Sequence, residues 1–233
     1  MKSLENSPIQ IAKETPNLAE NQRTRLNNLY RFQRHIYDLT RRTFLFGRDA
    51  MLRQMNAGTG EMILEVGCGT GRNLIALARL QPKAKLYGLD VSDEMLKTAG
   101  AKLDARNLEK SVVLRQGLAE EFDFRRTFRL DERFDKIFIS YSLSMFPLWG
   151  AALHNSLDNL KPGGSLFIID FWDGRGLPRW LIGLRAWWLG LFHVSYRPEF
   201  LQFLEKLERD GAGELKVAPV GRRYAFIAHF HKK

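Results

Sequence analysis

The amino-acid sequence predicts an α/β fold in which helices cover both faces of a mostly parallel sheet. From residue 62 onward, short runs typical of strands alternate with helix-like stretches. Runs such as Met62–Val66 and Ser165–Phe171 are almost continuously apolar, as strands that are buried on both faces are. Strands and helices that alternate at this spacing form right-handed crossover units, which build a parallel, doubly wound sheet.

The expected elements follow one another along the chain. Strands are predicted at Met62–Val66, Lys85–Asp90, Val112–Gln116, Phe134–Ser140 and Ser165–Phe171. Helices are predicted between them at Arg72–Leu80, Asp93–Asn107 and Trp149–Leu160. The second helix starts after Ser92, a good N-cap residue, and has acidic residues in its first turn. A short turn parts Leu215–Val220 from Tyr224–Phe230, so we expect an antiparallel hairpin to close the sheet.

The composition indicates one globular domain with flanking segments. The chain has 233 residues, 45% of them hydrophobic, which is enough to form a core without disulfides or metal. Its single cysteine, Cys68, excludes a disulfide scaffold and a clustered zinc site, and we expect no metal cofactor. The predicted organisation is a disordered tail at 1–22, a helical substrate or lid segment at 23–55, and a ligand-binding domain at 56–233 with a Trp- and Arg-rich insertion at about 173–198.

The formal net charge of +10 is concentrated outside the middle of the chain. Residues 56–171 carry as many acidic as basic side chains, whereas 23–53, 172–198 and the residues from 209 onward are basic. Basic segments attract nucleic acid, an anionic membrane or an anionic small molecule, or they are simply well solvated. The first 22 residues lack the apolar core of a secretory signal, so we expect a cytoplasmic protein.

A glycine-rich turn follows the first strand and opens a helix. Its glycines are spaced G-x-G-x-G, and the dinucleotide pattern G-x-G-x-x-G fails at Arg72; they are Gly67, Gly69 and Gly71. Glycines here permit positive φ and let a ligand approach the helix N-terminus. Glu65 would repel a pyrophosphate, which favours an adenosine that carries a cation. Asp90, at the end of the second strand, can accept hydrogen bonds from both ribose hydroxyls.

The pattern E-x-G-x-G-x-G followed by an acidic strand end resembles the class I S-adenosylmethionine-dependent methyltransferases. Leu160–Gly164 and the C-terminal hairpin resemble the same family, so the resemblance spans 62–233. It implies a Rossmann-like sandwich with a mostly parallel seven-stranded sheet. It also implies S-adenosyl-L-methionine as cofactor and S-adenosyl-L-homocysteine as product. The alternative is a glycine turn that binds no ligand.

The resemblance implies roles for residues at the ends of the first two strands. Gly67–Gly71 would wrap the methionine moiety, with Cys68 as a small residue of the loop. Asp90 would hold the ribose, and Glu65 would hydrogen-bond the loop or the cofactor's ammonium. The adenine would pack against Val91 and Met95.

The resemblance also implies contacts at the ends of the third and fourth strands. Leu118 stands where family members often have an acid that reads the adenine amino group, so Glu120 or a backbone carbonyl would replace that contact. Neighbouring cofactor contacts are implied for Gly117 and Ala119. Ser140 and Tyr141 would lie near the transferring methyl, with Tyr141 also positioning the substrate.

The segment after the fourth strand narrows the class of methyl acceptor. It reads Ser-Tyr-Ser-Leu-Ser-Met-Phe-Pro over 140–147, without the Asn/Asp-Pro-Pro-Tyr/Phe clamp that exocyclic base amines usually need. Because methyl transfer from a sulfonium is an in-line displacement, the enzyme contributes mainly alignment and desolvation. Among methyl acceptors, an aliphatic amine requires the least additional catalysis by the enzyme, provided that it binds in its unprotonated form.

A helical segment near the N-terminus carries an arc of aromatic and arginine side chains. The arc lies on one side of a predicted helix and consists of Tyr30, Arg34, Tyr37 and Arg41. Aromatic faces favour a quaternary ammonium, and Arg binds carboxylate in a bidentate way. The arc therefore suits a zwitterionic substrate. Its alternative is ordinary helix packing with arginines that reach solvent.

The segment Leu29–Asp49 resembles the N-terminal signature of bacterial diacylglycerylhomoserine N-methyltransferases, which make betaine lipids. The resemblance implies three methylations of an amine beside a carboxylate, giving diacylglyceryl-trimethylhomoserine. By analogy with related methyltransferases, Tyr37 would lie over the cofactor and Arg48 would reach its carboxylate. Other methyl acceptors stay open: phosphatidylethanolamine, an ornithine lipid, or a soluble small molecule. A regulator that binds the cofactor without turnover is a further alternative.

A lipid substrate requires access to a membrane. The segment Leu177–Phe192 is too short and too charged to span a bilayer, but its tryptophans and arginines suit the headgroup boundary. We therefore expect peripheral association with the anionic inner face of the cytoplasmic membrane. The alternative is a buried lid helix over the active site. A nucleic-acid partner is not expected, and the sequence leaves the oligomeric state open.

Overall fold

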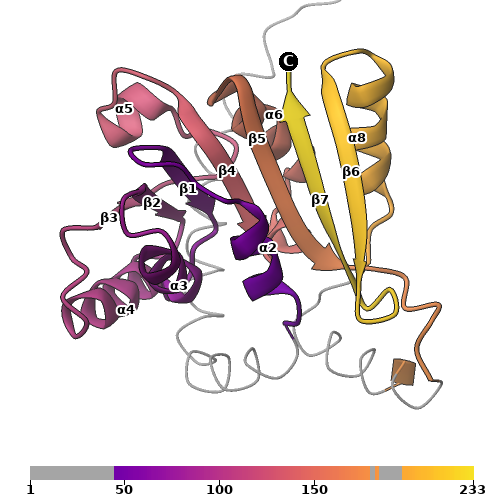
Figure 1. Ribbon diagram of the computed structural model, residues 1–233, viewed down its shortest axis with the longest axis horizontal. Helices are drawn as coiled ribbons and strands as arrows, with labels where there is room; N and C mark the ends of the chain where they lie inside the picture. The colour runs from indigo at the N-terminus through magenta and orange to yellow at the C-terminus, as the bar shows by residue number, and fades with distance from the viewer. Residues whose placement is uncertain (1–44, 179–181, 184–195) are drawn as a thin grey trace, which may run out of the picture.

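A seven-stranded sheet with helices on both faces forms the body of the protein (Figure 1). The computed structural model describes residues 45–178, 182–183 and 196–233. The strands are β1 (Met62–Val66), β2 (Lys85–Asp90), β3 (Val112–Gln116), β4 (Phe134–Ser140), β5 (Leu160–Phe171), β6 (Gly213–Val220) and β7 (Ala225–Lys232). The helices are α2 (Arg48–Gln54), α3 (Arg72–Leu80), α4 (Asp93–Asp104), α5 (Phe124–Phe128), the 3-10 turn η1 (Leu143–Met145), α6 (Trp149–Asp158) and α8 (Glu199–Arg209).

The sheet is parallel except at one side. Its order is β3-β2-β1-β4-β5-β7-β6, and β7 pairs antiparallel with both β5 and β6. The predicted fold is therefore confirmed, including the C-terminal hairpin. The order reverses direction beside β1, where β1 pairs with both β2 and β4. Ligands of open α/β sheets bind at such a switch point, outside the carboxyl ends of the strands.

Several boundaries differ from the prediction by a few residues, and two of these differences have a local reason. Strand β5 begins at Leu160 rather than at Ser165, and a bulge after Leu160 takes up the extra residues, because Phe134 pairs with Leu160 while Lys136 pairs with Ser165. Helix α4 ends at Asp104, before the predicted Asn107. Asn107 has a φ of 54°, a left-handed conformation that typically ends a helix.

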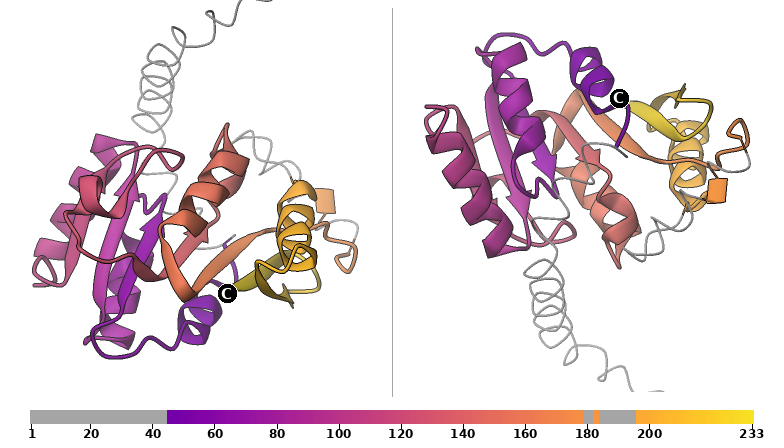
Figure 2. Two further views of the ribbon diagram at one scale, coloured as in Figure 1. Left: turned by 90° about the horizontal axis from the view of Figure 1, so that it is seen from above. Right: turned by 90° about the horizontal axis from the view of Figure 1, so that it is seen from below.

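Helices lie on both faces of the sheet (Figure 2), and the structure has two apolar clusters, one between each layer of helices and the sheet. One is covered by α5, α6 and α8, through side chains such as Phe128, Leu153 and Leu204. The other is covered by α2, α3 and α4, through side chains such as Leu52 and Leu74. Neither α5 nor α8 was predicted from the sequence. Burial of both faces explains why the central strands are almost entirely apolar.

Several predicted features lie outside the described residues. They are the tail at 1–22, the arc of Tyr30, Arg34, Tyr37 and Arg41, and most of Leu177–Phe192. Within the described part of the chain, no helix is both long and apolar enough to cross a membrane.

Candidate cofactor and active site

The glycine turn after β1 combines backbone conformation with close packing. Gly67, Gly69 and Gly71 have φ angles of 75°, 53° and 73°, which side chains other than glycine rarely adopt. A Cβ on Gly67 would lie 2.6 Å from the Ser142 Oγ, and one on Gly71 would lie 3.1 Å from the Ala99 Cβ. Gly67 and Gly71 therefore exclude larger residues for two reasons, their backbone conformation and the close packing of the segment after β4 and of helix α4.

Two buried carboxylates hold this turn in place. The Oδ2 of Asp90 accepts a hydrogen bond from the Gly69 N–H at 2.7 Å, and its Oδ1 accepts one from the Ser92 N–H at 2.9 Å. The Oε1 of Glu65 accepts a hydrogen bond from the Asn73 side-chain amide at 2.7 Å. Both acids are at least nine-tenths buried, so the turn carries concentrated negative charge in a region of restricted solvation.

Cys68 sits within the turn as a buried thiol. Burial raises its pKa well above the usual value, and the charges of Asp90 and Glu65 raise it further. A thiol whose pKa is raised stays protonated and unreactive at neutral pH. The structure thus makes Cys68 a packing residue of the loop.

Residues after β2 and β3 meet beside Asp90. Met95 is buried, and the Gln116 side chain donates a hydrogen bond to the Val91 carbonyl at 3.0 Å. The Gly117 N–H donates to the Asp90 carbonyl at 3.0 Å. Leu118 and Ala119 are buried next in the chain. Burial raises the pKa of Glu120, which follows them.

The segment after β4 packs across the mouth of the turn. Ser142 Oγ donates to the Val66 carbonyl at 3.2 Å, which fixes this segment to the end of β1. Tyr141 has a φ of 54°, and its hydroxyl donates to the Phe46 carbonyl at 2.6 Å. Among the described residues, the buried hydroxyl of Ser140 has no hydrogen-bond partner. An unsatisfied buried hydroxyl costs free energy, so this hydroxyl is available to a ligand.

A buried acid, Asp170, contacts the segment after β4. Asp170 lies near the end of β5, and its Oδ2 accepts a hydrogen bond from the Ser144 N–H at 3.3 Å. Its Oδ1 accepts one from the Phe171 N–H at 2.7 Å. Complete burial raises the pKa of Asp170 to about 7. The carboxyl group can therefore exchange a proton near neutral pH.

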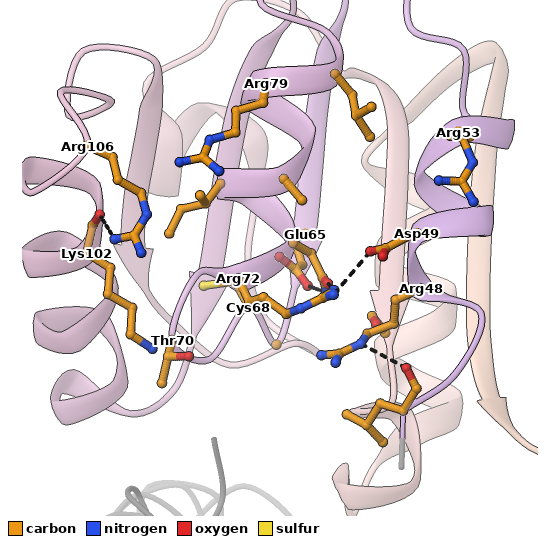
Figure 3. Close-up of a pocket in the computed structure, with 17 residues that line it drawn as sticks. Arg48, Asp49, Arg53, Glu65, Cys68, Thr70, Arg72, Arg79, Lys102 and Arg106 are labelled. Carbon is orange, nitrogen blue, oxygen red and sulfur yellow. Dashed lines mark hydrogen bonds and ion pairs between the residues drawn. The ribbon is translucent and has the colours of Figure 1, made fainter. Parts of the chain in front are cut away.

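A basic cleft of about 680 Å³ opens beside the turn (Figure 3). Arg48, on α2, is 6% exposed and reaches this cleft, and its Nε donates to the Leu45 carbonyl at 3.1 Å. Glu65, Gly67 and Ser140 line the same cleft. Its other charged lining residues are Asp49, Arg53, Arg72, Arg79, Lys102 and Arg106. Arg72 forms an ion pair with Asp49 at 3.2 Å.

Comparison with known proteins identifies the family. A model of the methyltransferase domain matches residues 63–164. The demethylmenaquinone methyltransferase of Anoxybacillus flavithermus is 32% identical over 87% of this chain and 81% of its own length. The chain belongs to the class I S-adenosylmethionine-dependent methyltransferases, enzymes of class EC 2.1.1.

Two further comparisons define how far the likeness extends. The demethylmenaquinone methyltransferase of Geobacillus stearothermophilus is 36% identical over 60% of this chain, and the match spans about half, 54%, of that relative's length. The crystal structure of a SAM-dependent methyltransferase from Aquifex aeolicus superimposes with a TM-score of 0.57 at 24% identity. That match covers 83% of this chain and 93% of the other, and it bears on the fold alone.

The site of this methyltransferase fits S-adenosylmethionine, whose charges are a sulfonium, an ammonium and a carboxylate. Glu65 and Asp90 provide negative charge at the turn, and Arg48 provides a buried cation in the adjoining cleft. The buried Ser140 hydroxyl without a partner lines this same cleft. A zwitterionic ligand with one further cation matches this donor set.

Sequence reasoning missed three residues that shape the methyltransferase site. They are Asn73, Ser142 and Asp170. An acid at the end of an otherwise apolar strand could have indicated Asp170. No pattern in the sequence indicated Asn73 or Ser142, because their partners lie on other elements.

Proposed function

We propose that this protein is an N-methyltransferase that trimethylates the amino group of diacylglycerylhomoserine to give diacylglyceryl-trimethylhomoserine. The sequence support is the resemblance of Leu29–Asp49 to enzymes with that activity. We place the reaction at the inner face of the cytoplasmic membrane, where a diacylglycerol-linked substrate resides.

One observation carries the proposal: the end of this segment is built into the methyltransferase site. The Phe46 carbonyl accepts a hydrogen bond from the Tyr141 hydroxyl. Arg48 reaches the cleft that Gly67 and Ser140 also line. The described end of this segment is therefore bonded to the residues after β4 and lines the same cleft as the cofactor turn. A segment with a separate task would not need these contacts.

The chemistry of the site suits an aliphatic amine. When bound, S-adenosylmethionine supplies an electrophilic methyl group. An amine that accepts this methyl must first lose a proton, and Asp170 is the buried acid beside the segment after β4. Because burial raises its pKa to about 7, the Asp170 carboxylate can take up such a proton at neutral pH. Tyr141 and Ser142 hold the intervening backbone in position.

A second candidate is methylation of a quinone ring. The relatives from Anoxybacillus flavithermus and Geobacillus stearothermophilus are both named demethylmenaquinone methyltransferases. Their acceptor is, by that name, a menaquinone precursor. This candidate shares the donor and differs in the nucleophile, so a direct comparison of substrates separates the two.

The test is methyl transfer by the purified protein in mixed micelles. Incubation with S-adenosylmethionine and diacylglycerylhomoserine should yield mono-, di- and trimethylated lipid by mass spectrometry. Parallel reactions contain phosphatidylethanolamine, an ornithine lipid or demethylmenaquinone, and the Asp90→Asn variant serves as a control for cofactor-dependent turnover. Methylation of another acceptor with none of diacylglycerylhomoserine would overturn the proposal. Cofactor binding without transfer to any acceptor would favour a regulator.

A further inference from the structure

Exposed apolar side chains gather at one edge of the sheet. Among the residues that the structure describes, five large apolar side chains stand out by exposure: Phe46 (53%), Leu80 (48%), Leu148 (54%), Ile182 (43%) and Val217 (38%). The parallel strands end toward the bottom of Figure 1. Three of the five residues lie in segments near these strand ends: Phe46 is bonded to Tyr141 just after β4, Leu148 precedes α6, and Ile182 follows β5. Leu80 ends α3 near the opposite edge, and Val217 lies within β6. Exposed apolar residues are ordinary when scattered, so their concentration at one edge is the informative feature.

Contacts and positions in the chain place these three residues near the carboxyl edge. The Phe46 ring packs edge-on against Tyr224, with 5.3 Å between ring centres, and Tyr224 directly precedes β7. Leu148 is the N-cap of α6, the helix that follows β4. Ile182 follows the end of β5, and its N–H donates to the Pro178 carbonyl at 3.1 Å.

Arginines accompany the apolar side chains at this edge. The loop after β5 and the β6–β7 turn supply three arginines, Arg175, Arg222 and Arg223. Two of them, Arg175 and Arg223, pair with the same acid, Asp173. Arg223 also lies over the Trp172 ring at 3.9 Å. The edge therefore carries net positive charge next to a half-buried tryptophan. Apolar side chains, tryptophan and arginine together suit the boundary between lipid headgroups and acyl chains.

We propose that this carboxyl-edge surface, formed by Phe46, Leu148, Trp172, Arg175, Ile182 and Arg222, docks on an anionic phospholipid bilayer. The inference rests on the proposed aminolipid substrate. Two acyl chains keep that substrate in the bilayer, so its amine reaches the ends of β1 and β4 only if this edge faces the membrane. The apolar side chains enter the headgroup region, and the arginines contact lipid phosphates.

The test compares two triple variants by vesicle flotation. Leu148→Glu, Ile182→Glu and Arg222→Glu alter the proposed surface without touching the cofactor turn. The matched control, Leu80→Glu, Val217→Glu and Lys110→Glu, makes the same change in formal charge at exposed positions elsewhere. The probe is a vesicle of phosphatidylcholine and phosphatidylglycerol without aminolipid, with vesicles of phosphatidylcholine alone as reference. Thermal melting of both variants checks that they fold.

The wild-type protein and the control should float with the anionic vesicles, and the surface variant should lose about tenfold or more of its partitioning. The surface variant should still methylate a short-chain, water-soluble substrate at the wild-type rate. Equal flotation of both variants, or no flotation of the wild type, would overturn the docking surface. Wild-type flotation without aminolipid methylation would instead retain the surface and reject the proposed function, so the two failures are distinguishable.

Discussion

The two edges of the parallel strands use charge in opposite ways. At the amino edge, Lys161 pairs with Glu132 at 2.8 Å and with Asp135 at 2.9 Å. Asp135 also accepts a hydrogen bond from the Met62 N–H at 2.8 Å, and Lys136 pairs with Glu61. Each of these charges has a partner of opposite sign or a backbone donor, at positions that solvent can partly reach. The charges at the amino edge therefore stabilise the fold.

At the carboxyl edge, by contrast, acidic side chains of the described part of the chain are buried. Glu65, Asp90 and Asp170 are buried acids that accept hydrogen bonds from backbone or amide donors. The buried Ser140 hydroxyl has no partner among the described residues. Burying such groups costs free energy that a ligand can recover. The comparison teaches that one sheet separates stabilising from ligand-binding electrostatics by strand direction. Substitutions at the two edges should therefore differ in effect, and the largest losses are expected at the buried acids of the carboxyl edge.

We expect the largest effect from Asp170→Asn, which removes the buried carboxylate proposed to accept the substrate proton. If its carboxylate takes the substrate proton, the variant should lose about 100-fold or more in kcat, with little change in cofactor affinity. The wild-type rate should rise with pH up to about 7, the pKa that burial gives Asp170, and the variant should lack this acidic limb. Steady-state kinetics across pH measures both effects. An unchanged profile would restrict Asp170 to a structural role.

The same substitution carries a stability prediction with a definite sign. The folded pKa of Asp170 is raised by burial from 3.8 to about 7, so the folded state binds more protons than the unfolded state between these values. The contribution of Asp170 to the free energy of unfolding therefore falls as the pH rises from 3.8 to about 7, by up to about 4 kcal/mol. Asp170→Asn should remove this fall. Urea unfolding at the two ends of the window compares the proteins.

Asp90→Asn should weaken the cofactor turn itself. The amide would present a donor or a weaker acceptor to the Gly69 N–H, in place of a charge-assisted hydrogen bond at 2.7 Å. We expect the dissociation constant for S-adenosylmethionine to rise roughly 10- to 100-fold, measured by calorimetry. Asp135→Asn, at the amino edge, is the matched control and should leave cofactor affinity unchanged. Similar losses in both variants would mean that the two edges are not separate.

Tyr141→Phe should have a smaller effect. It removes the hydrogen bond to the Phe46 carbonyl, worth about 0.5–1.5 kcal/mol, and loosens the segment before α2. KM for the aminolipid should rise several-fold, while affinity for S-adenosylmethionine changes little. Tyr87→Phe, in the core of β2, is the control and should leave KM unchanged. If Tyr141→Phe and Tyr87→Phe both keep the wild-type KM, the hydrogen bond between Tyr141 and Phe46 has no role in substrate binding.

Lys161→Ala should have the smallest effect. Its ion pairs at the amino edge are partly exposed, and such pairs contribute under about 1 kcal/mol. Melting should show a slight loss of stability, and calorimetry should show unaltered cofactor affinity. A clear loss of affinity for S-adenosylmethionine would show that the amino edge affects the cofactor site, so that the two edges are not separate.

Local patterns predicted most of the fold and the cofactor turn. Strands β1 to β4 and helix α3 have the predicted boundaries, because buried parallel strands are apolar runs and glycines precede the helix. Helices α5 and α8 were missed. Helix α5 is a single turn capped by Asp123, too short for a periodic pattern. Helix α8 becomes recognisable by the face that Phe200 and Leu204 bury against the sheet.

The sequence by itself determined the fold class, the methyltransferase family and the acids at the ends of β1 and β2, since these depend on residues close together in the chain. The tertiary structure decided which distant groups meet. It joined Tyr141 to the segment before α2, set Asn73 against Glu65, and enclosed Asp170 until its pKa approached neutrality. The physical reason is that burial and hydrogen bonding depend on neighbours from other strands and helices, and no local pattern encodes those neighbours.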